Sequence, residues 1–167
     1  DLFTHASRQK EMRPMGFLDD ITARFKSLVG DEEDGTAEDQ QLQKAIATLL
    51  VRSLVIDGEE TIEEAMKLVD LLKSKFDLSN REAEDLFNEA KVAERDATDL
   101  FKFTNVVTEQ MDRDGRISVL EMMFEIVAAD GKVDVFEENL MNRASNLLRV
   151  PDYYRDEVRS KLFALMG

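Results

Sequence analysis

The sequence predicts an all-α fold, a single helical domain of about seven to eight helices built from two pseudo-repeated helix hairpins. Three observations predict it. The 167 residues include only 7 Gly and 2 Pro, so few positions force the chain to turn. Apolar residues make up 43% of the chain and charged residues 35%, which is typical of amphipathic helices around a core. Apolar residues also recur at helical spacing through most of the sequence.

The first forty residues divide into three parts. Residues 1–15 lack periodicity and Met15-Gly16 resembles a natural start, so we interpret 1–15 as a loosely ordered extension or a tag remnant. Residues 16–30 predict an amphipathic helix, and residues 31–40, which are acidic and polar, predict a linker. The apolar face of the predicted helix is formed by Phe17, Leu18, Ile21, Phe25, Leu28 and Val29.

The polar face of this first helix carries acidic Asp19 and Asp20 beside basic Arg24 and Lys26, so it is not strongly cationic. We therefore expect residues 16–29 to dock on their own domain or on a partner, with peripheral membrane association as the weaker alternative. No apolar run approaches the roughly 20 residues that cross a bilayer, and no secretory signal pattern is found. The expected location is cytoplasmic, with any membrane contact peripheral to the inner membrane.

Residues 41–167 are expected to form the helical domain. The apolar segment 41–56 predicts a central buried helix. Further helices are predicted over 61–76, 79–94, 96–111, 114–129, 134–148 and 151 to about 166. Three of them begin with a capping box, in which a Ser, Thr or Asp is the N-cap and a Glu three residues later bonds back to it. The pairs are Thr61 with Glu64, Ser79 with Glu82, and Asp134 with Glu137.

A weak internal repeat relates the two halves of this domain. In each half an apolar helix ends in Asp-Gly, and a capped helix follows with a Glu seven residues after the Asp. The two pairs are Asp57 with Glu64 and Asp130 with Glu137. Each half then ends in a similar segment, FDLSN at 76–80 and LRVPD at 148–152. This repeat predicts a pseudo-twofold pair of helix hairpins whose acidic bends come together.

Two stretches of the chain resemble the TerB-like family of tellurite-resistance proteins, namely LLVRSLVIDGEETIEEAMKLVDLLKSKFDLS and LEMMFEIVAADGKVDVFEENLMNRASNLLRVP. DLFKFTNVVTEQ at 99–110 lies between them, as in the family, and the second stretch is the more specific match. Glu60 departs from the pattern, because an apolar residue normally follows the first Asp-Gly. The resemblance implies a TerB-like fold of two helical repeats in a bacterial protein of tellurite resistance or, more broadly, of metal and envelope stress response. It also implies a divalent-cation site at acidic residues, as proposed for some members.

The acidic residues of the two Asp-Gly links predict a candidate cation site. Hard cations such as Ca²⁺ and Mg²⁺ take oxygen ligands, which converging links would supply as carboxylates and free backbone carbonyls. The candidate ligands are Asp57, Glu64, Asp130 and Glu137, with Glu60, Glu121, Asp134 and Glu138 as additional candidates. Helix capping explains the same pattern without a metal, because a capping box needs Glu at this position and Asp-Gly is common at helix links.

A further acidic segment, residues 110–121, partly matches the twelve-residue calcium loop of EF-hands. Gln110 stands where that loop needs its first acidic ligand. Five other positions agree with it: Asp112, Asp114, Gly115, Ile117 and Glu121. A calcium sensor at 110–121 is one alternative function, and a ligand-free protein–protein adaptor is another.

Composition excludes several chemistries. The net charge of −14 repels nucleic acid and favours cations or basic protein surfaces as partners. The chain has no cysteine, which excludes thiol chemistry. Its one histidine is His5 in the N-terminal extension, so common zinc sites and catalytic triads are excluded from the body of the protein. Metal hydrolases and carboxylate-bridged oxidases also need histidine. We therefore predict a non-catalytic stress-response binding module with a protein partner and no cofactor other than Ca²⁺ or Mg²⁺.

Overall fold

A computed structural model of the chain describes residues 37–56, 58, 60–130 and 133–166. All regular structure in these residues is helical, which confirms the predicted fold class. The elements are α3 (Ala37–Val55), α4 (Ile62–Phe76), α5 (Asn80–Asp96), α6 (Phe101–Gln110), α7 (Arg113–Val127), the 3₁₀ helix η2 (Ala128–Asp130), α8 (Val135–Leu147) and α9 (Asp152–Met166). The predictions for residues 1–15 and 16–30 lie outside the described residues.

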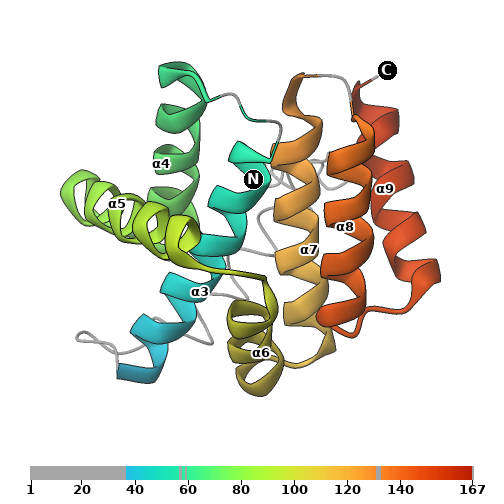
Figure 1. The fold of residues 1–167 in the computed structure, drawn as a ribbon, viewed down its shortest axis with the longest axis horizontal. Helices are drawn as coiled ribbons and strands as arrows, with labels where there is room; N and C mark the ends of the chain where they lie inside the picture. The colour runs from blue at the N-terminus through green and yellow to red at the C-terminus, as the bar shows by residue number, and fades with distance from the viewer. Residues whose placement is uncertain (1–36, 57, 59, 131–132, 167) are drawn as a thin grey trace, which may run out of the picture.

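Helix α3 is the centre of the molecule and contacts α4, α5, α6 and α7 (Figure 1). Its residues are buried without interruption from Ala45 to Val51, because neighbouring helices cover several of its faces. The predicted central helix is therefore confirmed. Its start was predicted wrongly, since residues 37–40 of the expected linker are helical. Glu38 and Asp39 lie in the first turn, where the positive end of the helix dipole favours acidic side chains.

The two predicted hairpins are α3 with α4 and α7 with α8. Helices α3 and α7 lie side by side and run in the same direction, so both links lie at the same end of the molecule (Figure 1). All three predicted capping boxes are present, on α4, α5 and α8. At the first link, Gly58 has a φ of 83° and donates its N–H to the carbonyl of Val55 at 2.9 Å. That left-handed conformation favours glycine.

The exits of the two hairpins have the same geometry. Asp77 and Arg149 both adopt left-handed backbone conformations, with φ of 57° and 59°. The residue after each of them donates its N–H to the carbonyl of the residue five positions earlier. Leu78 donates to the carbonyl of Lys73 at 3.0 Å, and Val150 donates to that of Ser145 at 2.9 Å. Hydrogen bonds of this kind satisfy carbonyls at the helix end. The predicted repeat therefore extends from the links to the exits.

Two further helix starts differ slightly from prediction. Helix α6 begins at Phe101 rather than near residue 96, and the carboxylate of Asp99 accepts the Phe101 N–H at 2.9 Å. Helix α7 begins at Arg113, and its N-cap Asp112 accepts the Gly115 N–H at 2.9 Å. Within the part of the chain that the structure describes, no helix combines the length and apolar character needed to cross a membrane.

Candidate functional site at the helix links

A pocket of about 240 Å³ lies between the helices of the two hairpins. It is lined by the ends of α3 and α7, the first part of α4, residue Ala129 of η2 and the first turn of α8. The apolar lining consists of Leu54, Leu68, Leu71, Ile126 and Val127. Glu64, Lys67, Glu125, Glu137 and Ser53 supply its polar groups. Both repeats therefore contribute carboxylates to one pocket.

Glu64 and Glu137 are the two predicted site residues that the structure brings to this pocket. Each is the reciprocal Glu of a capping box. One carboxylate oxygen of Glu64 accepts the Thr61 N–H at 3.1 Å, and one of Glu137 accepts the Asp134 N–H at 2.9 Å. These bonds fix both carboxylates at helix N-termini. The two residues differ in burial, because Glu64 is half-buried whereas Glu137 is only 6% exposed.

The two link aspartates cannot be placed in the same way. Asp57 lies outside the described residues, and so does the side chain of Asp130, whose backbone ends η2. Among the side chains that the structure does describe, no three acidic or histidine groups are clustered so that they could hold a metal ion. The four-carboxylate site therefore stays a prediction that depends on Asp57 and Asp130.

The four additional candidates do not line the pocket. Glu60 pairs with Lys91 of α5 at 3.1 Å, and Glu138 pairs with Arg159 of α9. The carboxylate of Asp134 accepts the Glu137 N–H at 2.8 Å as the N-cap of α8. Glu121 is buried within α7. Glu60 and Asp134 lie in the links themselves, but none of these four carboxylates lines the pocket between the hairpins.

Glu125 is the pocket residue that the sequence did not reveal. It lies near the end of α7, and its Oε1 atom is buried without a hydrogen-bond partner. Burial raises the pKa of this carboxyl, and the positive charge of Lys75 acts in the opposite direction. The available signal in the sequence was an acid within the apolar stretch MMFEIVAA, directly before the second link.

The calcium-loop alternative lacks the loop that it needs. Residues Arg113–Val127 form one continuous helix, so most of segment 110–121 is helical. Asp112 is the N-cap of this helix, and Glu121 lies on its buried face. Arg116 donates to the carbonyl of Leu148 at 2.9 Å and to that of Met111 at 3.1 Å, which ties the start of α7 to the end of α8. The partial motif is explained by helix capping and packing.

The fold thus defines a class of helical modules in which the helices of two repeated hairpins contribute carboxylates to one pocket. A model of the family described as tellurite resistance protein TerB matches residues 43–160, which include both links and both exits. The chain belongs to this family, as its two Asp-Gly stretches had indicated. Comparison with curated proteins gives no match, and comparison with solved structures gives none either.

Proposed function

We propose that the chain is a non-catalytic binding module of the tellurite-resistance type, and that it binds a divalent cation between its two helix links. The observation that carries this proposal is the buried, unpartnered carboxylate oxygen of Glu125 in a pocket shared with Glu64 and Glu137. A buried polar atom without a partner costs free energy. A cation held by this pocket and by the link aspartates would supply the missing partner.

The chemistry of the pocket favours a hard cation. Its polar lining includes three carboxylates against one lysine, Lys67, and no histidine or cysteine, and oxygen ligands suit Ca²⁺ and Mg²⁺. Ca²⁺ accepts six to eight oxygens in flexible geometry, whereas Mg²⁺ demands a near-ideal octahedron. Carboxylates at two separate links, completed by Asp57 and Asp130, fit the flexible geometry better. The net charge of −14 adds a long-range attraction for cations.

The proposed role follows from where the ion would be held. One cation shared by both links would couple the two hairpins and stiffen this end of the molecule. A cytoplasmic protein partner that recognises the stiffened links would then bind in response to the ion, which would act as the stress signal. The absence of histidine and cysteine from the pocket lining supports a binding role rather than catalysis.

Thermal unfolding with and without Ca²⁺ or Mg²⁺ tests the proposal. A ligand at 100 times its Kd stabilises the folded state by about 2.7 kcal/mol, and a domain of this size gains about 2–4 °C per kcal/mol. We expect an increase in Tm of about 5–10 °C with the preferred ion, and we expect it to be lost in Asp130→Asn and in Glu137→Gln. Glu82→Gln is the matched control, because Glu82 closes an equivalent capping box on α5 outside the pocket.

The variants also separate the alternatives. An ion-dependent shift that survives both pocket substitutions but disappears in Glu121→Gln would support a calcium site at 110–121 instead. If neither ion changes the Tm of the unmodified chain, the cation proposal fails. A ligand-free adaptor would then be the better description of this module.

A further inference from the structure

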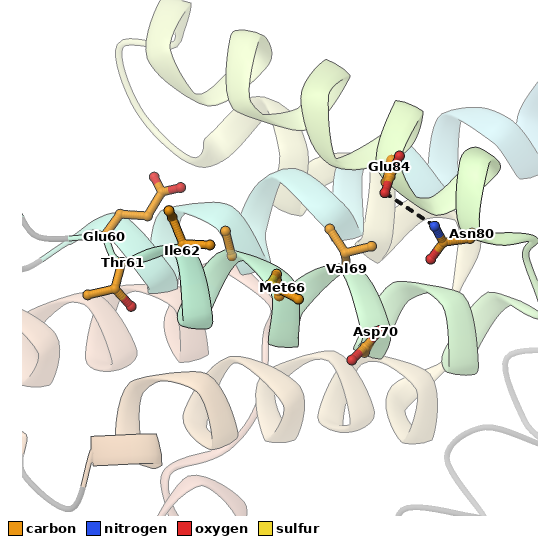
Figure 2. Close-up of a pocket in the computed structure, with 9 residues that line it drawn as sticks. Glu60, Thr61, Ile62, Met66, Val69, Asp70, Asn80 and Glu84 are labelled. Carbon is orange, nitrogen blue, oxygen red and sulfur yellow. Dashed lines mark hydrogen bonds between the residues drawn. The ribbon is translucent and has the colours of Figure 1, made fainter.

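A second groove, of about 350 Å³, lies between α4 and α5 (Figure 2). Its apolar residues follow one face of α4, where Ile62, Met66 and Val69 recur at intervals of four and three residues. Ile62 is 80% exposed and Met66 is 60% exposed. Large apolar side chains that lie next to each other on one helix face indicate a surface that is covered in the working protein.

The rim of this groove is acidic. Glu60, Asp70 and Glu84 line it, and no lysine or arginine does. Asn80 donates to Glu84 at 3.2 Å along α5 on one side of the groove (Figure 2). Lys91 pairs with Glu60 from outside the lining. The surface therefore suits an occupant that combines an apolar stripe with nearby positive charges.

We propose that residues 16–29 of the same chain cover this groove as an amphipathic helix. Phe17, Ile21 and Phe25 recur every four residues in this segment, so as a helix they would present one apolar stripe to Ile62 and Met66. Arg24 and Lys26 would supply local positive charge to the acidic rim, although Asp19 and Asp20 leave the segment with no net charge. The apolar stripe of the segment therefore matches the apolar face of the groove, and its two basic residues add a local electrostatic contribution.

Reach and tethering favour this occupant over a second copy of the chain or a free partner. Residues 30–36, seven in number, separate the segment from the start of α3 and can span up to about 25 Å. A helix of the segment's length adds about 21 Å to this reach. A domain of this size has a radius of gyration of only about 14 Å, so the groove is within reach of the tethered segment. A short tether also gives the segment an effective concentration in the millimolar range, which no free partner matches at ordinary concentrations.

Cross-linking in the full-length chain tests the docking directly, because the sequence has no cysteine of its own. One variant pairs Phe25→Cys with Met66→Cys. Its control pairs Phe25→Cys with Ser160→Cys, an exposed position on α9 at the opposite side of the molecule from α4 (Figure 1). With a short bis-maleimide reagent, we expect a cross-link within one chain for the first pair, at a yield independent of protein concentration, and little for the control.

Thiol reactivity supplies an independent readout. In the full chain carrying Met66→Cys alone, we expect modification by a soluble thiol reagent to be about tenfold slower than at Ser160→Cys, which corresponds to a docked state favoured by about 1.4 kcal/mol. Adding Ile21→Ser and Phe25→Ser to the Met66→Cys variant should restore the faster rate of thiol modification at position 66. Equal rates with and without these two changes would overturn the proposal, as would equal cross-linking of the control pair. Cross-links that form between chains and increase with concentration would overturn it in favour of a second copy.

Discussion

Glu64 of α4 and Glu137 of α8 hold equivalent positions in the two hairpins, and both line the pocket between the helix links. Each accepts the backbone N–H of its own N-cap residue. Only Glu137 is nearly inaccessible to solvent, at 6% exposed. The repeated sequence therefore gives the same local structure in two environments, and the difference in burial has consequences that can be measured.

The first prediction compares these two glutamates. Because the hydrogen bond of Glu137 is shielded from water, Glu137→Ala should lower the free energy of unfolding by about 1–2 kcal/mol. Glu64→Ala should cost about 0.5–1 kcal/mol, since water can replace its more exposed bond. Urea denaturation of both variants without added cation checks this order. A larger cost for Glu64→Ala would show that burial does not set the strength of these caps.

The second prediction concerns the pH dependence of stability at Glu125. Burial raises the pKa of this carboxyl in the folded state, against the opposing charge of Lys75. The folded protein therefore holds this proton more tightly than the unfolded chain does. Ionisation of the carboxyl lowers the stability of the folded state as the pH rises from the ordinary pKa to the raised pKa. Glu125→Gln cannot ionise, so its Tm relative to the unmodified protein should increase between pH 4 and pH 7.

The measurement for Glu125 is a set of melting curves across this pH range without divalent cations. Glu64, Glu137 and Lys67 of the same pocket are present in both proteins, so the difference between the two curves isolates position 125. A difference that is constant with pH, or that reverses in sign, would contradict the environment assigned to this carboxyl.

The third prediction tests the central position of α3. Leu49 is fully buried where α3 packs among its neighbours. Leu49→Ala should leave a cavity and cost about 2–5 kcal/mol, and so lower the Tm by roughly 4–20 °C. Val92→Ala serves as the control, because Val92 is 46% exposed and its truncation should change stability by no more than about 0.5 kcal/mol. Similar effects of the two substitutions would argue against the buried core described here.

The fourth prediction concerns Arg116, which bridges the start of α7 and the end of α8. Its guanidinium donates to the carbonyls of both Leu148 and Met111. Arg116→Ala should cost about 1.5–3 kcal/mol, and Arg116→Lys should recover little of it, because an ammonium group does not reproduce the planar fork. Thermal unfolding of both variants checks this. Arg95→Ala, which removes an exposed ion pair with Asp96, should cost at most about 1 kcal/mol.

Local sequence signals predicted most of the fold. The boxes at Thr61, Ser79 and Asp134 marked three helix starts, because the capping interaction is made within four residues and needs no tertiary context. The start of α3 was missed since Glu38, Asp39 and Gln40 are polar, and an exposed first turn has the same composition as a linker. The start of α6 depends on Asp99, whose short-range bond to the Phe101 N–H has no distinctive spacing.

The candidate site could be predicted only in part. The repeat identified Glu64 and Glu137, because equivalent positions in packed repeats come together. Glu125 has no counterpart in that repeat and follows no motif. Its burial arises from the packing of the end of α7 around the pocket, which the sequence of α7 alone does not contain. Glu60 and Glu138 are also acidic and lie near the links, so the sequence did not distinguish them from pocket residues. In the structure they pair with Lys91 and Arg159.

The central claim is that both helix links hold one divalent cation together. A crystal structure of the full chain grown with Ca²⁺ tests it most directly. We predict a single ion at the pocket between α3 and α7, with oxygen atoms from the Asp57 link and from the Asp130 link both at about 2.3–2.6 Å. Two ions bound separately at the links, or a fully resolved pocket with no ion at saturating Ca²⁺, would contradict the claim.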